Sequence, residues 1–499
     1  MAKSTIKKII WCLIIFFCAK VGFATDFLIT DFGAKRGESE LNTIPINKAV
    51  EACYKNGGGR VVVPAGIFRT GTIVLKDNVE LYLEPGSTLS ASINKDDFPL
   101  QPQPSYRSLK DPGGWRALIY ALEANHIAVT GFGTIDGNGA LQQPGPKAKT
   151  GDMDGRARNI LFISCKNIRV EGIYMRNSGI WNQHYLNCED VLVDKINVFN
   201  HANRNNDGID IDGCRRFILS NSVFDTDDDA VCLKSTGLAP CEDVVITNCV
   251  VSSFCNAIKT GTESTGGFKN IAISNCVIKP SRSEHRLFGD SIGIAGISLE
   301  IVDGGIMDGV SISNINIHGT ECPIYIRLGN RGRKHTEDAP EPSVGQMRNI
   351  VISNLVAYNT GNYSSSITAI PGHYVENVSL SNIQLFNRGA ISKANSLDEI
   401  EKVKEDIKGY PQPTTWKELP SSGLFIRHAK NIQVRGLMLN SQGADARTPV
   451  IAVDVDGLQI ESVSKIHNSL SDVFFKGLNV TDVDIQKPLG WQKQVAEIK

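Results

Sequence analysis

Apolar and polar residues alternate in short stretches along the chain, and each stretch begins at an Asn, Asp or Gly. Alternation with a period of two is typical of half-buried β-strands. The starts at Asn167 and Asp190 are 23 residues apart, and those at Asp243 and Asn270 are 27 apart. Later stretches, some separated by 39 or 40 residues, begin at Gly309, Asn349, Asn377 and Asn431. Short strands repeated at a period in the twenties, with Asn or Gly at the corners, indicate stacked β-coils.

We therefore predict an all-β protein whose chain forms a right-handed, single-stranded parallel β-helix. Leucine-rich repeats share the period but need a leucine framework that is missing here, and a β-sandwich or a propeller requires hairpin turns or longer repeats. Successive coils of a β-helix are separated by one strand spacing, roughly 4.8 Å. Residues one coil apart in the sequence are therefore expected to be neighbours in space.

The two ends of the repeat region and one internal segment depart from the pattern. Residues 46–54 have the spacing of a short amphipathic helix, which we expect to cap the open end of the solenoid within a cap of about residues 25–75. Residues 388–420 contain a charged stretch, Leu397 to Ile407, that predicts a helix in an inserted loop. A solenoid can run this long as one unit, so residues 25–499 are predicted to form a single domain.

Residues 1–24 have the pattern of an export signal. Three lysines precede an apolar run from Ile9 to Cys18, and Gly22-Phe23-Ala24 supplies small residues at a cleavage site. The run is shorter than the roughly 20 residues that a membrane span needs, which argues against an anchor. Cys18 is a weaker candidate for lipidation. We expect a periplasmic or extracellular protein.

Composition narrows the partners further. Of the 499 residues, 41% are hydrophobic and 21% charged, which suits a folded protein. Removal of residues 1–24 leaves 48 basic and 53 acidic residues, a net charge of −5. No basic arm and no further apolar span is present, so we expect neither nucleic-acid binding nor a membrane span. We also expect the protein to be a monomer. The ten remaining cysteines lack a CxxC spacing; Cys232 and Cys241 either form a disulfide or are buried thiols.

Acidic residues are concentrated in two segments, one coil apart. The first runs from Asn205 to Asp212 and the second from Asp225 to Asp229; Asp207 and Asp228 are 21 residues apart. Adjacent coils bring such residues together on one face, and inverting glycosidases need two carboxyl groups about 6.5–9.5 Å apart. Strict alternation along a strand sends Asp228 and Asp229 to opposite faces, so both reach one site only if the chain turns there.

These segments resemble glycoside hydrolase family 28, the polygalacturonase-like enzymes. The family's Asn-x-Asp-Gly element matches Asn205 to Gly208, and its Asp-Asp pair matches Asp228-Asp229. Further similar segments are Asp31-Phe32-Gly33-Ala34, residues 131–137, Trp181-Asn182-Gln183-His184 and residues 323–331. The resemblance implies a hydrolase of α-linked, galacturonate-containing pectic chains, with Asp228 as the general acid, Asp207 and Asp229 holding the attacking water, and no cofactor or metal ion.

The sequence departs from this family at two places. The histidine of a Gly-His-Gly element is absent from residues 253–259, as it is in rhamnogalacturonan-cleaving relatives, and Gly329 replaces the lysine of an Arg-x-Lys element that begins at Arg327. Arginine suits the bidentate binding of a uronate carboxylate. The predicted substrate-binding residues are Arg327, Lys259, Arg331, His184, Trp181 and Asn205. Lys234 is a further candidate for the missing positive charge, and Glu263 a further candidate carboxylate.

Other functions remain open at this point. A rhamnogalacturonan hydrolase of the same family is the first alternative. A calcium-dependent pectate lyase would use the oxygens of Asp225, Asp227, Asp228 and Asp229 as ligands. A β-helical protein that binds glycans without cleaving them is the third, because a fold alone does not establish activity. Long loops at residues 96–116, 280–305 and 331–346 are candidates to block the ends of a cleft and favour exo cleavage.

Overall fold

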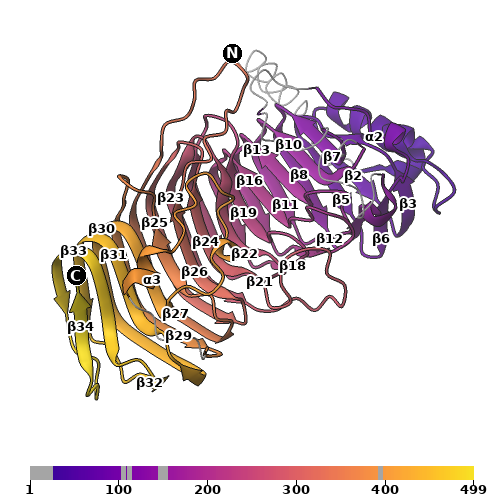
Figure 1. Cartoon of the computed structure of the whole chain (residues 1–499). Helices are drawn as coiled ribbons and strands as arrows, with labels where there is room; N and C mark the ends of the chain where they lie inside the picture. Colours follow the sequence, from indigo (N-terminus) through magenta and orange to yellow (C-terminus); the bar gives the residue numbers. More distant parts are fainter. Residues whose placement is uncertain (1–25, 103–107, 109–114, 144–154, 391–396) are drawn as a thin grey trace, which may run out of the picture.

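The computed structural model describes residues 26–102, 108, 115–143, 155–390 and 397–499, and these form one elongated β-helix (Figure 1). The predicted export signal therefore lies outside the described residues. All of the assigned strand pairings are parallel, and the chain coils in the right-handed sense that parallel crossovers favour. The predicted fold class is confirmed.

Three ladders of strands run along the solenoid, and they merge where the later strands become long enough to bend around a corner. One ladder consists of β1 (Asp26–Leu28), β2 (Gly59–Val63), β5 (Val79–Leu83), β8 (Asn125–Gly131), β11 (Lys166–Glu171), β14 (Glu189–Asp194), β17 (Arg215–Ser220), β20 (Cys241–Thr247), β23 (Gly267–Ile278), β25 (Ile306–His318), β27 (Gln346–Thr360), β29 (Val375–Asn387), β30 (Ser421–Asp445), β31 (Thr448–Glu461) and β33 (Val473–Ile485). A second consists of β3 (Gly66–Thr70), β6 (Ser87–Ala91), β9 (Thr134–Asp136), β12 (Tyr174–Arg176), β15 (Asn197–Asn200), β18 (Val223–Thr226) and β21 (Val250–Ser253), and it joins β23.

The third ladder carries the acidic segments. It consists of β4 (Ile73–Val74), β7 (Ala117–Leu122), β10 (Arg158–Ile163), β13 (Gln183–Leu186), β16 (Ile209–Asp212), β19 (Val231–Ser235), β22 (Asn256–Ser264), β24 (Ala295–Ile301), β26 (Cys322–Leu328) and β28 (Ser365–Thr368), and it joins β30. The strand β32 (His467–Ser469) pairs with β30, and β34 (Gln494–Ile498) pairs with β33.

Side chains in the third ladder alternate between the core and the outer face. Ile211 and Leu233 pair across β16 and β19 and lie in the continuous apolar core. On the outer face, Asp210 pairs with Cys232, and Cys232 with Lys259. Each coil therefore repeats the inward and outward positions of the previous one, which aligns polar residues into columns along the solenoid.

The helix α2 (Thr43–Lys55) packs over the first strands at the indigo end of Figure 1, which confirms the predicted capping helix. Its buried residues Ile46, Ala49, Val50 and Cys53 face the core. Short 3₁₀ helices are η1 (Ile29–Phe32), η2 (Lys95–Asp97), η3 (Gly139–Leu141) and η4 (Pro413–Thr415). No helix in the described ranges has both the length and the hydrophobicity to cross a membrane.

The insertion at 388–420 joins β29 to β30 and contains α3 (Leu397–Glu401). The helix is shorter than the predicted span of Leu397 to Ile407, and residues after Glu401 adopt irregular backbone. Ile400 of α3 belongs to one apolar cluster with Phe425 of β30 and Ile451 of β31, so α3 lies on the outer face of the solenoid.

The cysteines of the described residues are all free and buried. Cys241 belongs to the apolar core, whereas Cys232 lies on the outer face of β19, where its Sγ contacts the carbonyl oxygen of Gly261 at 3.1 Å. Of the two interpretations for this pair, the structure shows buried thiols and no disulfide.

Candidate active site

Asp207, Asp228 and Asp229 lie at the beginning of two neighbouring strands of the third ladder. Asp207 comes just before β16, and Asp228 and Asp229 lie in the bend between β18 and β19. One carboxylate oxygen from each residue lies within 4.8 Å of the others. The one-coil spacing therefore brings the three acids together, as the sequence predicts.

The bend between β18 and β19 explains how the consecutive residues Asp228 and Asp229 both reach one site. The hydroxyl groups of Thr226 and Ser253 donate hydrogen bonds to the carbonyl oxygen of Asp228, at 2.6 and 2.7 Å. The Oδ1 atom of Asp229 accepts from the side-chain amide of Asn256 at 2.6 Å. Because these contacts interrupt the strand at residues 227–230, the alternation rule no longer separates Asp228 from Asp229.

The position after Asp207 requires glycine for a steric reason. A Cβ atom at Gly208 would lie 2.5 Å from the carbonyl oxygen of Ala230, inside van der Waals contact. The backbone N–H of Gly208 donates to the carbonyl oxygen of Asp229 at 3.0 Å. The two acidic bends are thus joined directly, which explains the Asp-Gly part of the motif in physical terms.

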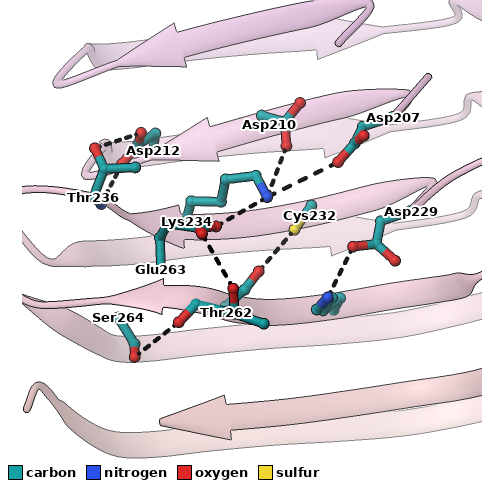
Figure 2. Close-up of polar contacts among 12 residues, drawn as sticks. Asp207, Asp210, Asp212, Asp229, Cys232, Lys234, Thr236, Thr262, Glu263 and Ser264 are labelled. Atoms are coloured by element: carbon teal, nitrogen blue, oxygen red, sulfur yellow. Dashed lines mark hydrogen bonds and ion pairs between the residues drawn. The ribbon is translucent and has the colours of Figure 1, made fainter. Parts of the chain in front are cut away.

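Two buried lysines lie among the carboxylates. Lys234 extends from β19 between Asp210 and Asp207 on one side and Glu263 on the other, with Nζ–oxygen distances of 3.4, 3.9 and 3.3 Å (Figure 2). Lys259 of β22 approaches the Oδ2 atom of Asp229 at 3.0 Å. The lysines partly neutralise the acidic cluster, since burial would otherwise penalise the negative charges heavily.

Burial and the closeness of other carboxylates raise the pKa values of these acids. Burial, together with the nearby Asp210 and Asp228 carboxylates, raises the pKa of Asp207 well above its usual range. Burial and the charge of Asp229 raise the pKa of Asp228 to about 6. Burial raises the pKa of Asp210 to about 8, although Lys234 lowers it. At least one carboxyl group in this cluster is therefore protonated in mildly acidic solution, as general acid catalysis requires.

Two cavities meet at the acids. The first, about 260 Å³ and here named the basic cavity, has the lining residues Trp181, Asn205, Asp207, Asp228, Asp229, Lys234, Lys259, Thr262, Glu263, Arg331, Arg333 and Tyr410. The second, about 410 Å³ and here named the mixed cavity, has the lining residues Arg204, Asn205, Asp228, Asp229, Cys255, Asn256, Phe288, Tyr410 and Gln412. Both cavities share Asn205, Asp228, Asp229 and Tyr410. The acids thus lie where the two cavities join.

Four of the six predicted substrate-binding residues line the basic cavity: Trp181, Asn205, Lys259 and Arg331. The indole ring of Trp181 lies under the Lys234 ammonium, 4.6 Å from it. Arg331 lies over the ring of Tyr410 at 5.0 Å. These residues surround the acids on the side where Lys234 and Lys259 concentrate positive charge.

The other two predicted residues lie beneath the surface. His184 is fully buried, and its Nε2 atom lies 3.1 Å from Asp212, with the ring edge-on to Trp181. The guanidinium of Arg327 is 2% exposed and donates to the carbonyl oxygens of Ala369, Glu405 and Asp406. Neither residue lines the two cavities, so their places in the structure are those of packing and anchoring groups.

Asp225 and Asp227 bind a different part of the chain from the trio of Asp207, Asp228 and Asp229. Asp225 accepts hydrogen bonds from the Ser281 hydroxyl and the Arg282 backbone N–H, and it pairs with His201 at 3.0 Å. Asp227 accepts from the backbone N–H of Leu287 at 2.7 Å. These acids fasten the loop after β23 and do not belong to the group of Asp207, Asp228 and Asp229, whose oxygens are close enough to share a metal ion. The four acids named in the lyase hypothesis therefore do not form one site.

Sequence reasoning missed Tyr410, Arg333, Phe288 and Asn256 as lining residues. Tyr410 comes from the insertion, 151 positions after Lys259, and its hydroxyl lies 3.2 Å from the Lys259 ammonium. Arg333 binds Glu263 at 3.0 Å and Asp303 at 2.7 Å. The periodic spacing that identified the acids says nothing about loops that return to the site from outside the repeat.

The model of the glycosyl hydrolases family 28 matches residues 53–408. A probable polygalacturonase of Vitis vinifera is 26% identical over 415 residues, which cover 79% of this chain and 80% of the relative. An exo-poly-alpha-D-galacturonosidase of Dickeya chrysanthemi is 29% identical over 251 residues, 41% of either chain.

Solved structures share the fold. A hyperthermoactive exopolygalacturonase from Thermotoga maritima superposes with a TM-score of 0.62 at 20% identity, over 83% of this chain and 92% of that one. A family 28 exopolygalacturonase of Yersinia enterocolitica gives 0.60 at 18% identity, over 94% and 79%. Together with the family match across well over half of the sequence, these findings show that the chain belongs to glycosyl hydrolases family 28 and is a glycoside hydrolase that acts on O-glycosidic bonds.

Proposed function

We propose that the protein hydrolyses α-linked, galacturonate-containing pectic polysaccharide and inverts the anomeric centre. The observation that carries the proposal is the composition of the basic cavity, where the three catalytic carboxyl groups and Glu263 meet four cationic side chains: Lys234, Lys259, Arg331 and Arg333. Because the pKa values of Asp207 and Asp228 are raised, the cations outnumber the ionised acids in mildly acidic solution, which suits a negatively charged uronate. The names of the Vitis and Dickeya relatives, a polygalacturonase and a galacturonosidase, support the same substrate.

Asp228 is the general acid in this proposal. Its pKa of about 6 leaves it protonated in mildly acidic solution. Asp228 lines both cavities, so it can reach the glycosidic oxygen between a sugar in one cavity and a sugar in the other. Asp207 and Asp229 hold the attacking water. The nearest oxygens of the trio, within 4.8 Å, are closer than the roughly 6.5–9.5 Å of a simple inverting pair. Retention through a covalent intermediate is the competing course.

Arg331 is the residue we assign to the substrate carboxylate. Lys234, Lys259 and Arg333 are each within 4.0 Å of a carboxylate of the protein. In the described part of the chain, Arg331 forms no such ion pair, and its guanidinium donates a hydrogen bond to the Thr262 hydroxyl at 3.4 Å. Its guanidinium therefore retains donors for a uronate, which a planar fork binds in two-point fashion.

A rhamnogalacturonan hydrolase is the second candidate. The mixed cavity contains one cationic residue, Arg204, beside Phe288 and Cys255, whereas the basic cavity contains four. A chain that alternates a uronate with a neutral, more apolar sugar fits that asymmetry. Product analysis on defined oligogalacturonides and rhamnogalacturonan oligosaccharides separates the two candidates, and the same products show whether cleavage starts from a chain end, as in the exo-acting relatives.

The reaction class is tested by measuring reducing ends in the presence of EDTA. We expect release to continue without a product that absorbs in the ultraviolet. A lyase stops when calcium is chelated and forms an unsaturated product, and a protein that only binds glycans releases nothing. Either result would contradict the proposal.

We also propose that residues 1–24 direct export and that the mature protein acts as a monomer. Three lysines before the apolar run of Ile9 to Cys18 support export. The N-terminal sequence of protein recovered outside the cytoplasm, and its mass in solution, are the measurements. A mature chain that still begins at Met1 contradicts the first part.

A further inference from the structure

Two buried arginines hold the insertion against the outer face. Arg427 of β30 donates to the carbonyl oxygens of Val403 and Lys404, at 2.7 and 2.9 Å. Arg327 of β26 donates to those of Glu405 and Asp406, at 2.7 and 3.1 Å. Four consecutive carbonyl groups are thus bound by two side chains.

The register of the ladder explains why the two arginines act together. Arg327 pairs with Thr368 of β28, and Thr368 pairs with Arg427 of β30, so all three occupy one outward column. Both arginines are at most 2% exposed. A buried guanidinium requires acceptors for its N–H groups, and the insertion supplies them through its backbone. Removing Arg427 therefore takes a donor from the carbonyl groups of Val403 and Lys404, and removing Arg327 takes one from those of Glu405 and Asp406.

Further contacts hold the segment after the four carbonyls. The indole N–H of Trp416 donates to the carbonyl oxygen of Lys404 at 2.8 Å, and the Arg327 guanidinium lies 5.2 Å from the Trp416 ring centre. The backbone N–H of Asn330 donates to the carbonyl oxygen of Ile407 at 2.8 Å. The chain is therefore fixed on both sides of Tyr410.

Tyr410 lies four residues after Asp406, the last of the four bound carbonyl groups, and it lines the active site. Its hydroxyl accepts from the Lys259 ammonium at 3.2 Å, and that ammonium also lies 3.0 Å from Asp229. The side chain is 49% exposed, and it lines both the basic and the mixed cavity. Tyr410 thus combines an anchored hydroxyl with a half-exposed ring, which Arg331 approaches to 5.0 Å, beside the catalytic acids.

We propose that Tyr410 is a substrate-contacting residue that determines sugar specificity, and that Arg327 and Arg427 are positioning residues that place it. The ring presents an apolar surface to the C–H face of a sugar where two sugars meet at the acids. Arg327 therefore contributes to substrate binding through the insertion and not through a substrate carboxylate. The proposal relies on the proposed function only in taking the ligand to be a pectic sugar chain.

Steady-state kinetics of the full-length enzyme on an oligosaccharide that it cleaves test the role of Tyr410. Tyr410→Ala is expected to raise KM about three- to tenfold, the range of an aromatic contact. Tyr410→Phe keeps the ring and is expected to raise KM less. Tyr358→Ala is the matched control, because Tyr358 is 39% exposed and stacks on His318 outside the two cavities. An unchanged KM in Tyr410→Ala overturns the assignment.

A double variant tests whether the arginines act through Tyr410. Arg427→Lys breaks the two-carbonyl grip but keeps the charge, and it is expected to raise KM in the otherwise unchanged enzyme. In the Tyr410→Ala background the same change is expected to have no further effect on KM. If Arg427→Lys raises KM by the same factor with and without Tyr410→Ala, Arg427 does not act through Tyr410, which contradicts the positioning role.

Hydrogen exchange of residues 397–420 provides a readout that requires no substrate. Arg427→Lys and Arg327→Met are expected to accelerate exchange there, whereas Tyr410→Ala leaves the segment near Val403 to Asp406 protected. Arg348→Met, which removes a partly exposed ion pair with Asp308, is the control. If the enzyme cleaves no galacturonate chain, the proposed function fails. Hydrogen exchange still shows whether Arg327 and Arg427 hold the insertion in place. Unchanged exchange in both arginine variants overturns that role.

Discussion

The ammonium of Lys259 lies 3.0 Å from the Oδ2 atom of Asp229, and both side chains are buried. Burial alone would lower the pKa of Lys259, but the charges of Asp229 and Glu300 outweigh it and raise the pKa well above its usual value. The lysine therefore stays charged at neutral and mildly acidic pH.

Lys259→Met is expected to lower the free energy of unfolding by about 3–5 kcal/mol, because it leaves a buried carboxylate without its partner. Urea denaturation measures the loss. Combining it with Asp229→Asn is expected to restore most of the stability. Lys166→Met is the control for a surface pair, since Lys166 is 58% exposed beside Glu189, and it should cost about 1 kcal/mol at most. Equal stability of the single and double Lys259 variants argues against a stabilising pair.

Asp228 is expected to set the basic limb of the pH–rate profile. A general acid works in its protonated form, so activity should fall as the pH rises through about 6, the pKa to which burial and Asp229 raise this group. Asp228→Asn is expected to lower kcat on the polymer by about 10²–10⁴-fold. An aryl glycoside with a good leaving group needs little protonation and should restore most of the rate. Equal losses on both substrates would assign the acid to Asp207 or Asp229.

The first product is expected to have the inverted anomeric configuration. The proposed water, held by Asp207 and Asp229, attacks from the face opposite to the departing oxygen. Proton NMR of a reaction followed within minutes distinguishes the two anomers before mutarotation. Retained configuration would make one of these carboxylates a nucleophile and reject the water-holding role.

Arg331→Gln is expected to raise KM for galacturonate oligosaccharides about 10- to 100-fold, the value of a hydrogen bond to a charged group. The same variant should have little effect on a carboxyl-reduced analogue, in which the uronate carboxylate is absent. Arg348→Gln, on a partly exposed ion pair with Asp308, should leave both KM values unchanged. An equal loss on both substrates would mean that Arg331 supports the fold of the site and does not bind the carboxylate.

The repeat predicted the solenoid and the meeting of the acids because both depend on the same regular spacing. Asp207 and Asp228 are one coil apart, and backbone pairing between coils fixes the register. The capping helix was expected at 46–54 and spans Thr43–Lys55, a difference of the kind that helix ends commonly show. Local patterns were sufficient wherever the neighbouring coil determined the structure.

Tertiary contacts determined what the sequence did not reveal. The charged stretch after Leu397 has helical propensity, yet its helix ends at Glu401, and the carbonyl groups that follow are bound by Arg427 and Arg327. Propensity is a weak preference that such contacts override. The same contacts explain why Arg327, expected beside the substrate, lies under the insertion, and why Tyr410 reaches the site.

The outward column of Asp210, Cys232 and Lys259 has a consequence for how this architecture can change over evolution. Loops between coils vary widely in length without shifting the strands that flank them, because each strand takes its register from the coil below. Deleting one residue inside a strand turns its column inward, whereas deleting ten from a loop leaves every column in place. The strands therefore fix the positions of the polar columns, whereas loops can be exchanged without moving them, and the insertion at 388–420 is the natural place to begin changing the substrate preference.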